Sequence, residues 1–96
     1  MSEQTAIIPR PDLLDDTGSH AGEWLVTVFD NDKNTFDQVI MILQQATGCT
    51  LEEAEMETWE VHHLGKSIVH HADQAECERV ASVISTIGIK VSVDPL

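Results

Sequence analysis

The segment Val61–Ile68, with the sequence VHHLGKSI, joins two different hydrophobic patterns. Upstream of it, apolar or small residues recur with the spacing of one helical face. These residues are Leu51, Ala54, Thr58 and Val61. Downstream of the Leu64-Gly65 turn, β-branched residues favour a short strand. We therefore expect a helix over residues 51–62 and a strand over residues 66–69.

Capping signals place another helix before this one. Thr35 and Gln38 have the spacing of a capping box, and Thr50 and Glu53 repeat that spacing at the start of the helix over residues 51–62. The helix that begins at Thr35 has one apolar face, made by Phe36, Val39, Ile40 and Leu43. Gly48 is expected to end it.

A third helix is expected after the 66–69 strand, because Asp73 and Glu76 form another N-terminal cap. Its inner face consists of Cys77, Val80, Ala81, Ile84 and Ile87. Gly88 should end this helix. Residues 24–29 and 89–93 have the alternation of strands.

The expected element order is therefore β-α-α-β-α-β. Helices that are segregated from a small antiparallel sheet make an α+β sandwich, here three helices on a three-stranded antiparallel sheet. Residues 23–96 suffice for this one domain. Residues 1–22 contain several Pro, Gly and Asp residues and no sustained hydrophobic period, so we expect a flexible acidic tail. Its Ile7-Ile8 and Leu13-Leu14 pairs leave open a short docking motif.

The charge balance limits the classes of partner that the protein is expected to bind. Seventeen acidic residues against five basic ones give a formal charge of −12, which disfavours nucleic acid and anionic membranes. The expected partners are cationic protein surfaces, metal ions or free amino termini. Cys49 and Cys77 form no CxxC pair, and the sequence has no secretory signal or apolar stretch of membrane-spanning length. We expect a cytoplasmic protein with two reduced thiols.

Three segments together resemble the core of the ClpS family of Clp protease adaptors, over residues 24–94. The first is Val26–Asp32, a strand that runs into an acidic, amide-rich turn, and the second is the helix over residues 35–43. The third is Val61–Ile68, which contains the Val-His-x-x-Gly-Lys pattern of the family. The family's β-α-α-β-α-β fold is the one expected here.

The resemblance implies an adaptor that binds the free N-terminal residue of a substrate protein, one with a bulky apolar side chain. The substrate is then delivered to a Clp ATPase-protease, which the adaptor contacts at the ATPase's N-terminal domain. An α-ammonium group has three donors and a positive charge, so it needs acceptors of which at least one is ionised. The positions that match the family's ammonium-binding residues are Asp30, Asn31 and His62. Those that match its hydrophobic pocket are Asn34, Phe36, Val39, Thr58 and Val61.

The sequence departs from the family pattern at both parts of this site. Asp30 and Asn31 stand in the reverse of the usual order, so the carboxylate and the amide have exchanged places. Phe36 is larger than the usual residue and Thr58 is polar, so the pocket is expected to be smaller or wetter. One expected consequence is a preference for substrates whose first residue has a smaller side chain. The alternative is a ClpS-like protein-protein interaction module that has lost N-terminal-residue binding.

Other functions have weaker support. Residues 46–54 resemble a stretch of the C-terminal domain of the ribosomal stalk protein, but that domain lacks the Val-His-x-x-Gly-Lys pattern. The pairs His62-His63 and His70-His71 invite a zinc site, although neighbours on a strand point to opposite faces. No catalytic motif is present, so we expect neither an enzyme nor a cofactor or metal. Glu78 and Arg79 are candidates for the surface that contacts the ATPase.

Overall fold

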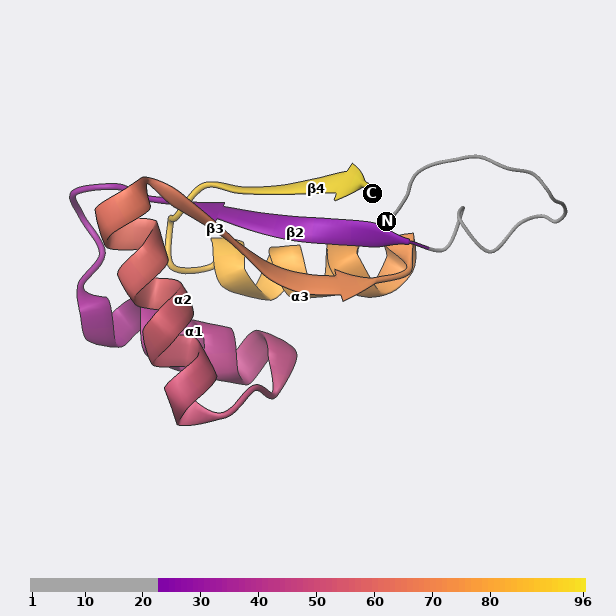
Figure 1. Cartoon of the computed structure of the whole chain (residues 1–96). Helices are drawn as coiled ribbons and strands as arrows, with labels where there is room; N and C mark the ends of the chain where they lie inside the picture. The colour runs from indigo at the N-terminus through magenta and orange to yellow at the C-terminus, as the bar shows by residue number, and fades with distance from the viewer. Residues whose placement is uncertain (1–22) are drawn as a thin grey trace, which may run out of the picture.

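The computed structural model describes residues 23–96, so the predicted tail over residues 1–22 lies outside the described part. The elements are β2 (Trp24–Phe29), α1 (Phe36–Thr47), α2 (Leu51–Leu64), β3 (Lys66–Ala72), α3 (Gln74–Ser85) and β4 (Val91–Pro95). The strands form one antiparallel sheet in the order β3-β2-β4 (Figure 1). The predicted α+β fold and its element order are confirmed.

Side-chain caps fix where the helices begin. Thr35 and Thr50 each accept a hydrogen bond from the backbone of the third helical residue, whose side chain bonds back to the cap, so both capping boxes are complete. Asp73 caps α3 by accepting from the backbone of Glu76. Gly48 and Gly65 end α1 and α2 in the left-handed conformation.

Several predicted boundaries were wrong. α2 continues two residues beyond the expected end. β3 extends to Ala72 because it pairs with β2 on both sides of an irregularity at Val69. α3 ends at Ser85, one turn before Gly88, which instead closes the following turn at φ 84°. Leu51, expected on the inner face of α2, is 52% exposed.

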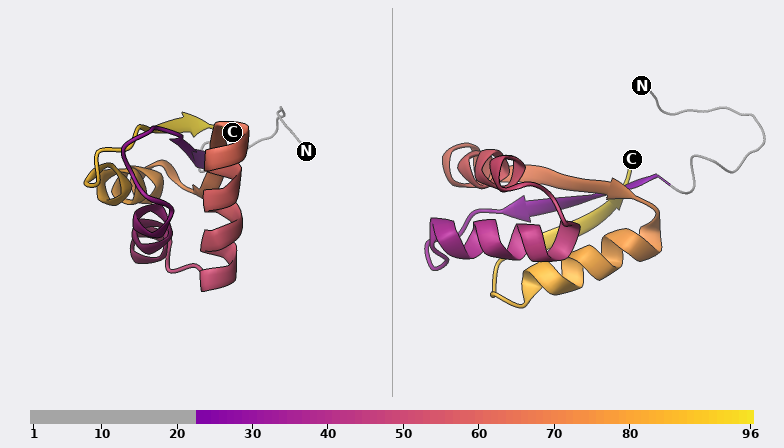
Figure 2. Two further views of the ribbon diagram at one scale, coloured as in Figure 1. Left: turned by 90° about the vertical axis from the view of Figure 1, so that its left-hand side faces the viewer. Right: turned by 90° about the horizontal axis from the view of Figure 1, so that it is seen from below.

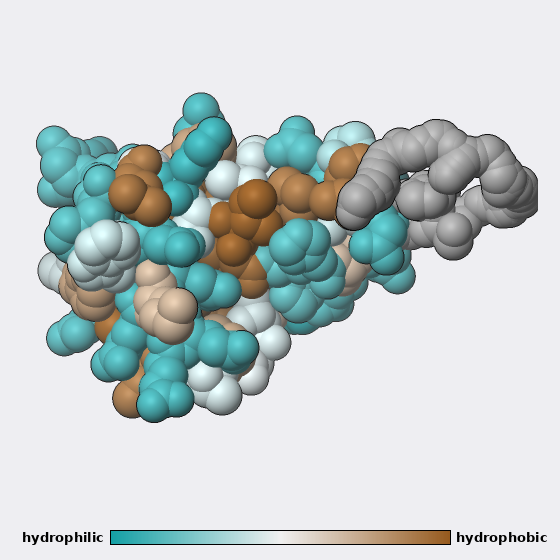
Figure 3. Space-filling view, viewed as in Figure 1, coloured by the Kyte–Doolittle hydropathy of each residue, from teal (hydrophilic) through white to brown (hydrophobic). Residues whose placement is uncertain are grey.

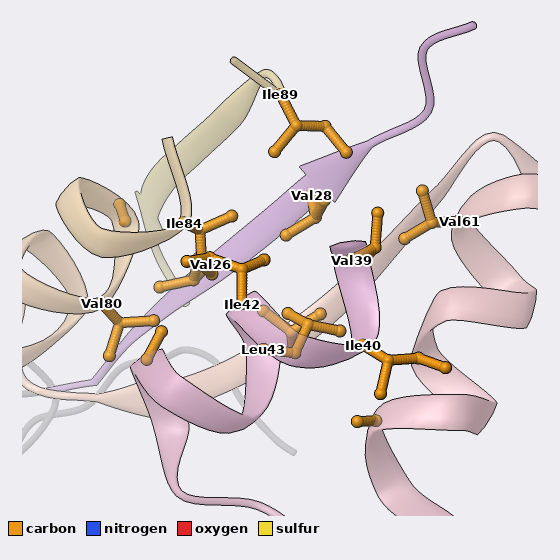
Figure 4. Packing of buried hydrophobic residues seen from close by; sticks show 14 of the residues in the cluster. Val26, Val28, Val39, Ile40, Ile42, Leu43, Val61, Val80, Ile84 and Ile89 are labelled. Carbon is orange, nitrogen blue, oxygen red and sulfur yellow. The ribbon is translucent and has the colours of Figure 1, made fainter. Parts of the chain in front are cut away.

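The three helices lie on one side of the sheet (Figure 2). α3 packs against all three strands, α1 packs between α2 and α3, and α2 contacts the sheet at its β3 edge. The core lies between these layers and consists of aliphatic side chains, ten of which are labelled in Figure 4. Burying each Val, Leu or Ile side chain contributes about 1.5–3 kcal/mol. The middle of the central strand β2 is buried on both faces, since Val26, Thr27 and Val28 are all buried, whereas the rest of the strand is partly exposed.

The turn at Gly65 leads from α2 into β3 and also holds the end of α2 beside the end of β2. Gly65 has a φ of 93°, which lets the chain reverse from the helix into β3. Its carbonyl accepts a 2.9 Å hydrogen bond from the backbone N–H of Asp30, and Phe29 pairs with Lys66 in the sheet. The residues that follow β2 are therefore held beside the last turn of α2.

Replacing Gly65 should lower the stability of the fold only because other residues disfavour its backbone conformation. A Cβ at this position would meet no atom within 4 Å, so the cost of Gly65→Ala is that of the left-handed conformation, about 1 kcal/mol. Gly65→Asn should cost less, because asparagine tolerates this conformation better. Urea unfolding of the three proteins measures the difference, and an alanine variant as stable as the parent would contradict this explanation.

Candidate functional site

Asp30 and His62 meet at the end of β2. Asp30 is the first residue after the strand, and His62 lies in the last turn of α2. The Nδ1 atom of His62 is 3.0 Å from Oδ1 of Asp30, and their side chains are 24% and 36% exposed, respectively. Two residues that are 32 positions apart in the sequence thus form one polar, solvent-accessible pair.

This contact determines what the imidazole can do. An ionised carboxylate can only accept a hydrogen bond, so the neutral imidazole must have its hydrogen on Nδ1. Nε2 is then left with a lone pair and becomes an acceptor. The pair therefore offers an ammonium group one nitrogen acceptor, together with carboxylate oxygen acceptors that have a negative charge.

Asn31 and Asn34 have a different arrangement. The side-chain oxygen of Asn31 accepts from the backbone N–H groups of Lys33 and Asn34, at 3.2 and 3.0 Å, and its amide donates to Oδ1 of Asn34 at 2.8 Å. The amide of Asn34 donates in turn to the carbonyl of Ile87 at 2.8 Å. Both amides hold the turn after β2 against the loop that precedes β4. The structure does not direct them toward the Asp30–His62 pair.

The pocket positions differ in exposure. Phe36, the first residue of α1, is 36% exposed, and its ring centroid lies 5.2 Å from that of His62. Val39, Thr58 and Val61 have no exposed surface, so a ligand reaches them only if neighbouring side chains move. The Thr58 hydroxyl donates to the carbonyl of Ala54 at 2.7 Å, so it is satisfied within its own helix.

The histidines of the two pairs do not converge on one site. Nδ1 of His63 lies 3.0 Å from the carbonyl oxygen of Trp59, and the two rings stack with centroids 4.4 Å apart. His70 lies 3.3 Å from Glu76, and His71 is exposed on β3. Within residues 23–96, no group of three or more His, Cys, Asp or Glu side chains is arranged to hold a metal ion.

The candidate delivery residues lie on α3. Arg79 donates to both carboxylate oxygens of Glu76 and, at 3.1 Å, to the carbonyl of Ala46 at the end of α1. The Arg79 guanidinium holds the pKa of Glu76 well below its usual range, at about 2. Glu78 accepts a hydrogen bond from Gln74. Arg79 thus joins α3 to α1, and Glu78 is bonded only within its helix.

Comparisons with known proteins identify the family of the chain. A family model described as "ATP-dependent Clp protease adaptor protein ClpS" matches residues 19–93. The chain belongs to the ClpS family. Among solved structures, ClpS2 of Agrobacterium tumefaciens bound to L-phenylalaninamide superposes with a TM-score of 0.74 at 13% identity, covering 79% of this chain and 99% of that one. No curated protein matches the sequence.

Membership in the ClpS family makes the chain a Clp protease adaptor in general terms. The family match also decides against the ribosomal stalk resemblance, since it spans nearly all of the described domain. ClpS proteins are adaptors rather than enzymes. In the part of the chain that the structure describes, no helix has the length and apolar character needed to cross a membrane. Cys49 and Cys77 are both free thiols.

The Asp30–His62 contact predicts the tautomer of the imidazole. At a pH where the ring is neutral, His62 should be protonated on Nδ1, and Asp30→Ala should shift it toward the Nε2-protonated form. His63 is an internal control, because its Nδ1 must donate to the Trp59 carbonyl in both proteins. The ¹⁵N chemical shifts of the imidazole nitrogens distinguish the two forms. An unchanged His62 in the variant would show that Asp30 does not set its tautomer.

Proposed function

We propose that this ClpS-family adaptor binds the free amino terminus of a substrate protein at Asp30 and His62 and delivers the protein to a Clp ATPase. The observation that carries the proposal is the 3.0 Å Asp30–His62 contact at an accessible position. An ammonium donates to Nε2 of His62 and to the Asp30 carboxylate, and charge-assisted bonds of this kind are the strong ones.

The exchanged order of Asp30 and Asn31 supports this assignment. The side chain that contacts His62 is the Asp30 carboxylate and not the Asn31 amide. The Asn31 side chain instead accepts hydrogen bonds from the backbone of the turn. Asp30 therefore supplies the ionised acceptor, and Asn31 acts indirectly by fixing the turn. The related ClpS2 is bound to L-phenylalaninamide, an amino-acid amide, which is the chemical class of ligand proposed here.

The substrate's first side chain is proposed to lie against Phe36 and to reach Val39 and Val61 behind it. Both valines are fully buried, so the pocket has to open before a large side chain enters. A small or medium apolar first residue suits this arrangement best. Delivery is proposed to proceed through the N-terminal domain of a Clp ATPase, in the cytoplasm, with Glu78 and Arg79 as the candidate contacts.

A second candidate is an interaction module that no longer binds amino termini. The observations that favour it are the closed pocket and the occupied Asn31 and Asn34 side chains. It predicts binding to a Clp N-terminal domain without binding to any free amino terminus. Measurements of both interactions on the same protein separate the two candidates.

Peptides that differ only in their first residue test the proposed function. A peptide with a free amine and an apolar first residue should bind with about micromolar affinity, or about −8 kcal/mol. Acetylation, Asp30→Ala and His62→Ala should each abolish measurable binding in fluorescence anisotropy, whereas His63→Ala should not. Peptides that bind equally well after acetylation would refute the proposal.

Phe36 should set the size of the first residue that is accepted. Phe36→Ala removes the ring beside His62, so peptides that begin with Phe or Leu gain access to Val39 and Val61. Their affinity should rise about tenfold, which corresponds to burying roughly 55 Å² of apolar surface. Met41→Ala, an exposed change on the same helix, should have no effect. Weaker binding of large first residues to the Phe36→Ala variant would instead make Phe36 a direct contact.

A further inference from the structure

A second groove lies between the first half of α2 and the strand β3, away from the Asp30–His62 pair. Its volume is about 420 Å³, within the range of roughly 300–1,000 Å³ that ligand sites occupy. The groove is lined by Thr47, Cys49, Glu53, Glu57, Ile68, Val69, His70 and His71. Figure 3 shows the side of the molecule that bears α2 and β3, where hydrophilic side chains predominate over α2 and an apolar patch lies over the middle of β3.

Glu57 is the unusual member of this lining. Its Oε1 atom is buried and has no hydrogen-bond partner, and within residues 23–96 it is the one buried side-chain polar atom of which this is true. Buried polar groups in proteins are nearly always paired, and an unpaired one needs an explanation. Burial, together with the carboxylates of Glu53 and Glu60, raises the pKa of Glu57 to about 7. The free protein therefore places a desolvated carboxyl group at the groove without a counter-ion.

The neighbouring polar groups are already occupied. Glu53 accepts hydrogen bonds from Thr50 in the capping box, and Glu60 accepts one from Ser67. His70 is paired with Glu76. In the described part of the chain, no lysine or arginine forms an ion pair with a glutamate of α2. Among the groove's residues, Glu57 is the one with a buried side-chain polar atom that lacks a partner, and the charge that would satisfy it is positive.

We propose that this groove binds the cationic side chain of an arginine or lysine on a partner protein, with Glu57 as its counter-ion. The bound cation supplies the hydrogen-bond donors that the Glu57 carboxylate lacks, and the apolar stem of the side chain packs on Ile68 and Val69. The site is separate from the one proposed for the substrate's amino terminus. It therefore gives the adaptor a second, independent contact with a partner.

Binding at this groove depends on pH. Glu57 has to be ionised, so its protonation at lower pH opposes the binding of a cation. His70 and His71 are the histidines that line the groove. Glu53 and Glu60, on the same helix, and the Cys49 thiol are the other titratable groups that face or adjoin it. With a pKa of about 7, Glu57 is roughly 90% ionised at pH 8 and 10% at pH 6. Its own titration should therefore weaken binding about ninefold between these two values.

The probe is an N-acetylated, C-amidated glycine–arginine–glycine peptide, which has no free amine and so cannot engage the Asp30–His62 site. Titration of the ¹⁵N-labelled full chain at pH 8 should shift the backbone resonances of Glu57, His70 and His71. The same peptide with citrulline in place of arginine keeps the shape without the charge and should not bind. Equal binding of both peptides would overturn the proposal, as would no binding of the arginine peptide.

Two variants on α2 distinguish specific binding of the peptide in the groove from its general attraction to an acidic helix. Glu57→Gln and Glu55→Gln remove the same charge, but residue 55 is exposed. Glu57→Gln should reduce affinity at least as much as acidification does, about ninefold, while Glu55→Gln should change it by less than about twofold. Equal losses in the two variants, or affinity that is the same at pH 6 and pH 8, would overturn the proposal.

A stability measurement checks the premise without any ligand. The folded-state pKa of Glu57 exceeds its unfolded value of 4.5, so its ionisation destabilises the fold progressively as pH rises toward and past about 7. Glu57→Gln should therefore raise the melting temperature at pH 8 relative to the parent protein, and this gain should be smaller at pH 5. A variant without any gain at pH 8 would show that Glu57 is already satisfied.

Discussion

The hydrogen bond from the Asp30 backbone to the Gly65 carbonyl is the constraint on which the candidate site depends. It fastens the residue after β2 to the turn after α2, and the sheet pairing of Phe29 with Lys66 reinforces it. The Asp30 and His62 side chains meet because their backbones are held in this way. The glycine turn thus links the end of the central strand to the end of a helix at one accessible corner of the domain.

The same corner shows how one residue exchange can be accommodated. Asparagine accepts and donates hydrogen bonds within turns, and Asn31 does this with the backbone of Lys33 and Asn34. A carboxylate at the preceding position is left free to reach His62. The amide at position 31 thus holds the turn, and the acid at position 30 contacts the histidine.

Sequence reasoning succeeded at the starts of the helices, where the determining contacts are local. The caps at Thr35, Thr50 and Asp73 lie within three residues of their partners, and each helix begins where its cap predicts. The boundaries of β3 depend on pairing with a distant strand and were missed. The role of Asn34 was also missed, because its partner Ile87 is 53 positions away. The partial burial of Glu57 could not be predicted from the sequence, because an acidic run on a helix usually faces solvent.

The position of β2 has a mechanical consequence. Six of its residues pair with β3 and five with β4, and its first residue, Trp24, follows the first described residue, Glu23. Tension applied through residues 1–22 would enter the domain at the start of its central strand and run along that strand toward Asp30. If the opposing force acts at the Asp30 end of β2, both hydrogen-bond ladders are loaded in shear and many bonds share the load. A pull between the two ends of the chain would instead open the β2–β4 ladder from its Trp24–Pro95 end. The resistance of the domain to a pull on its N-terminal end thus depends on where the opposing force is applied.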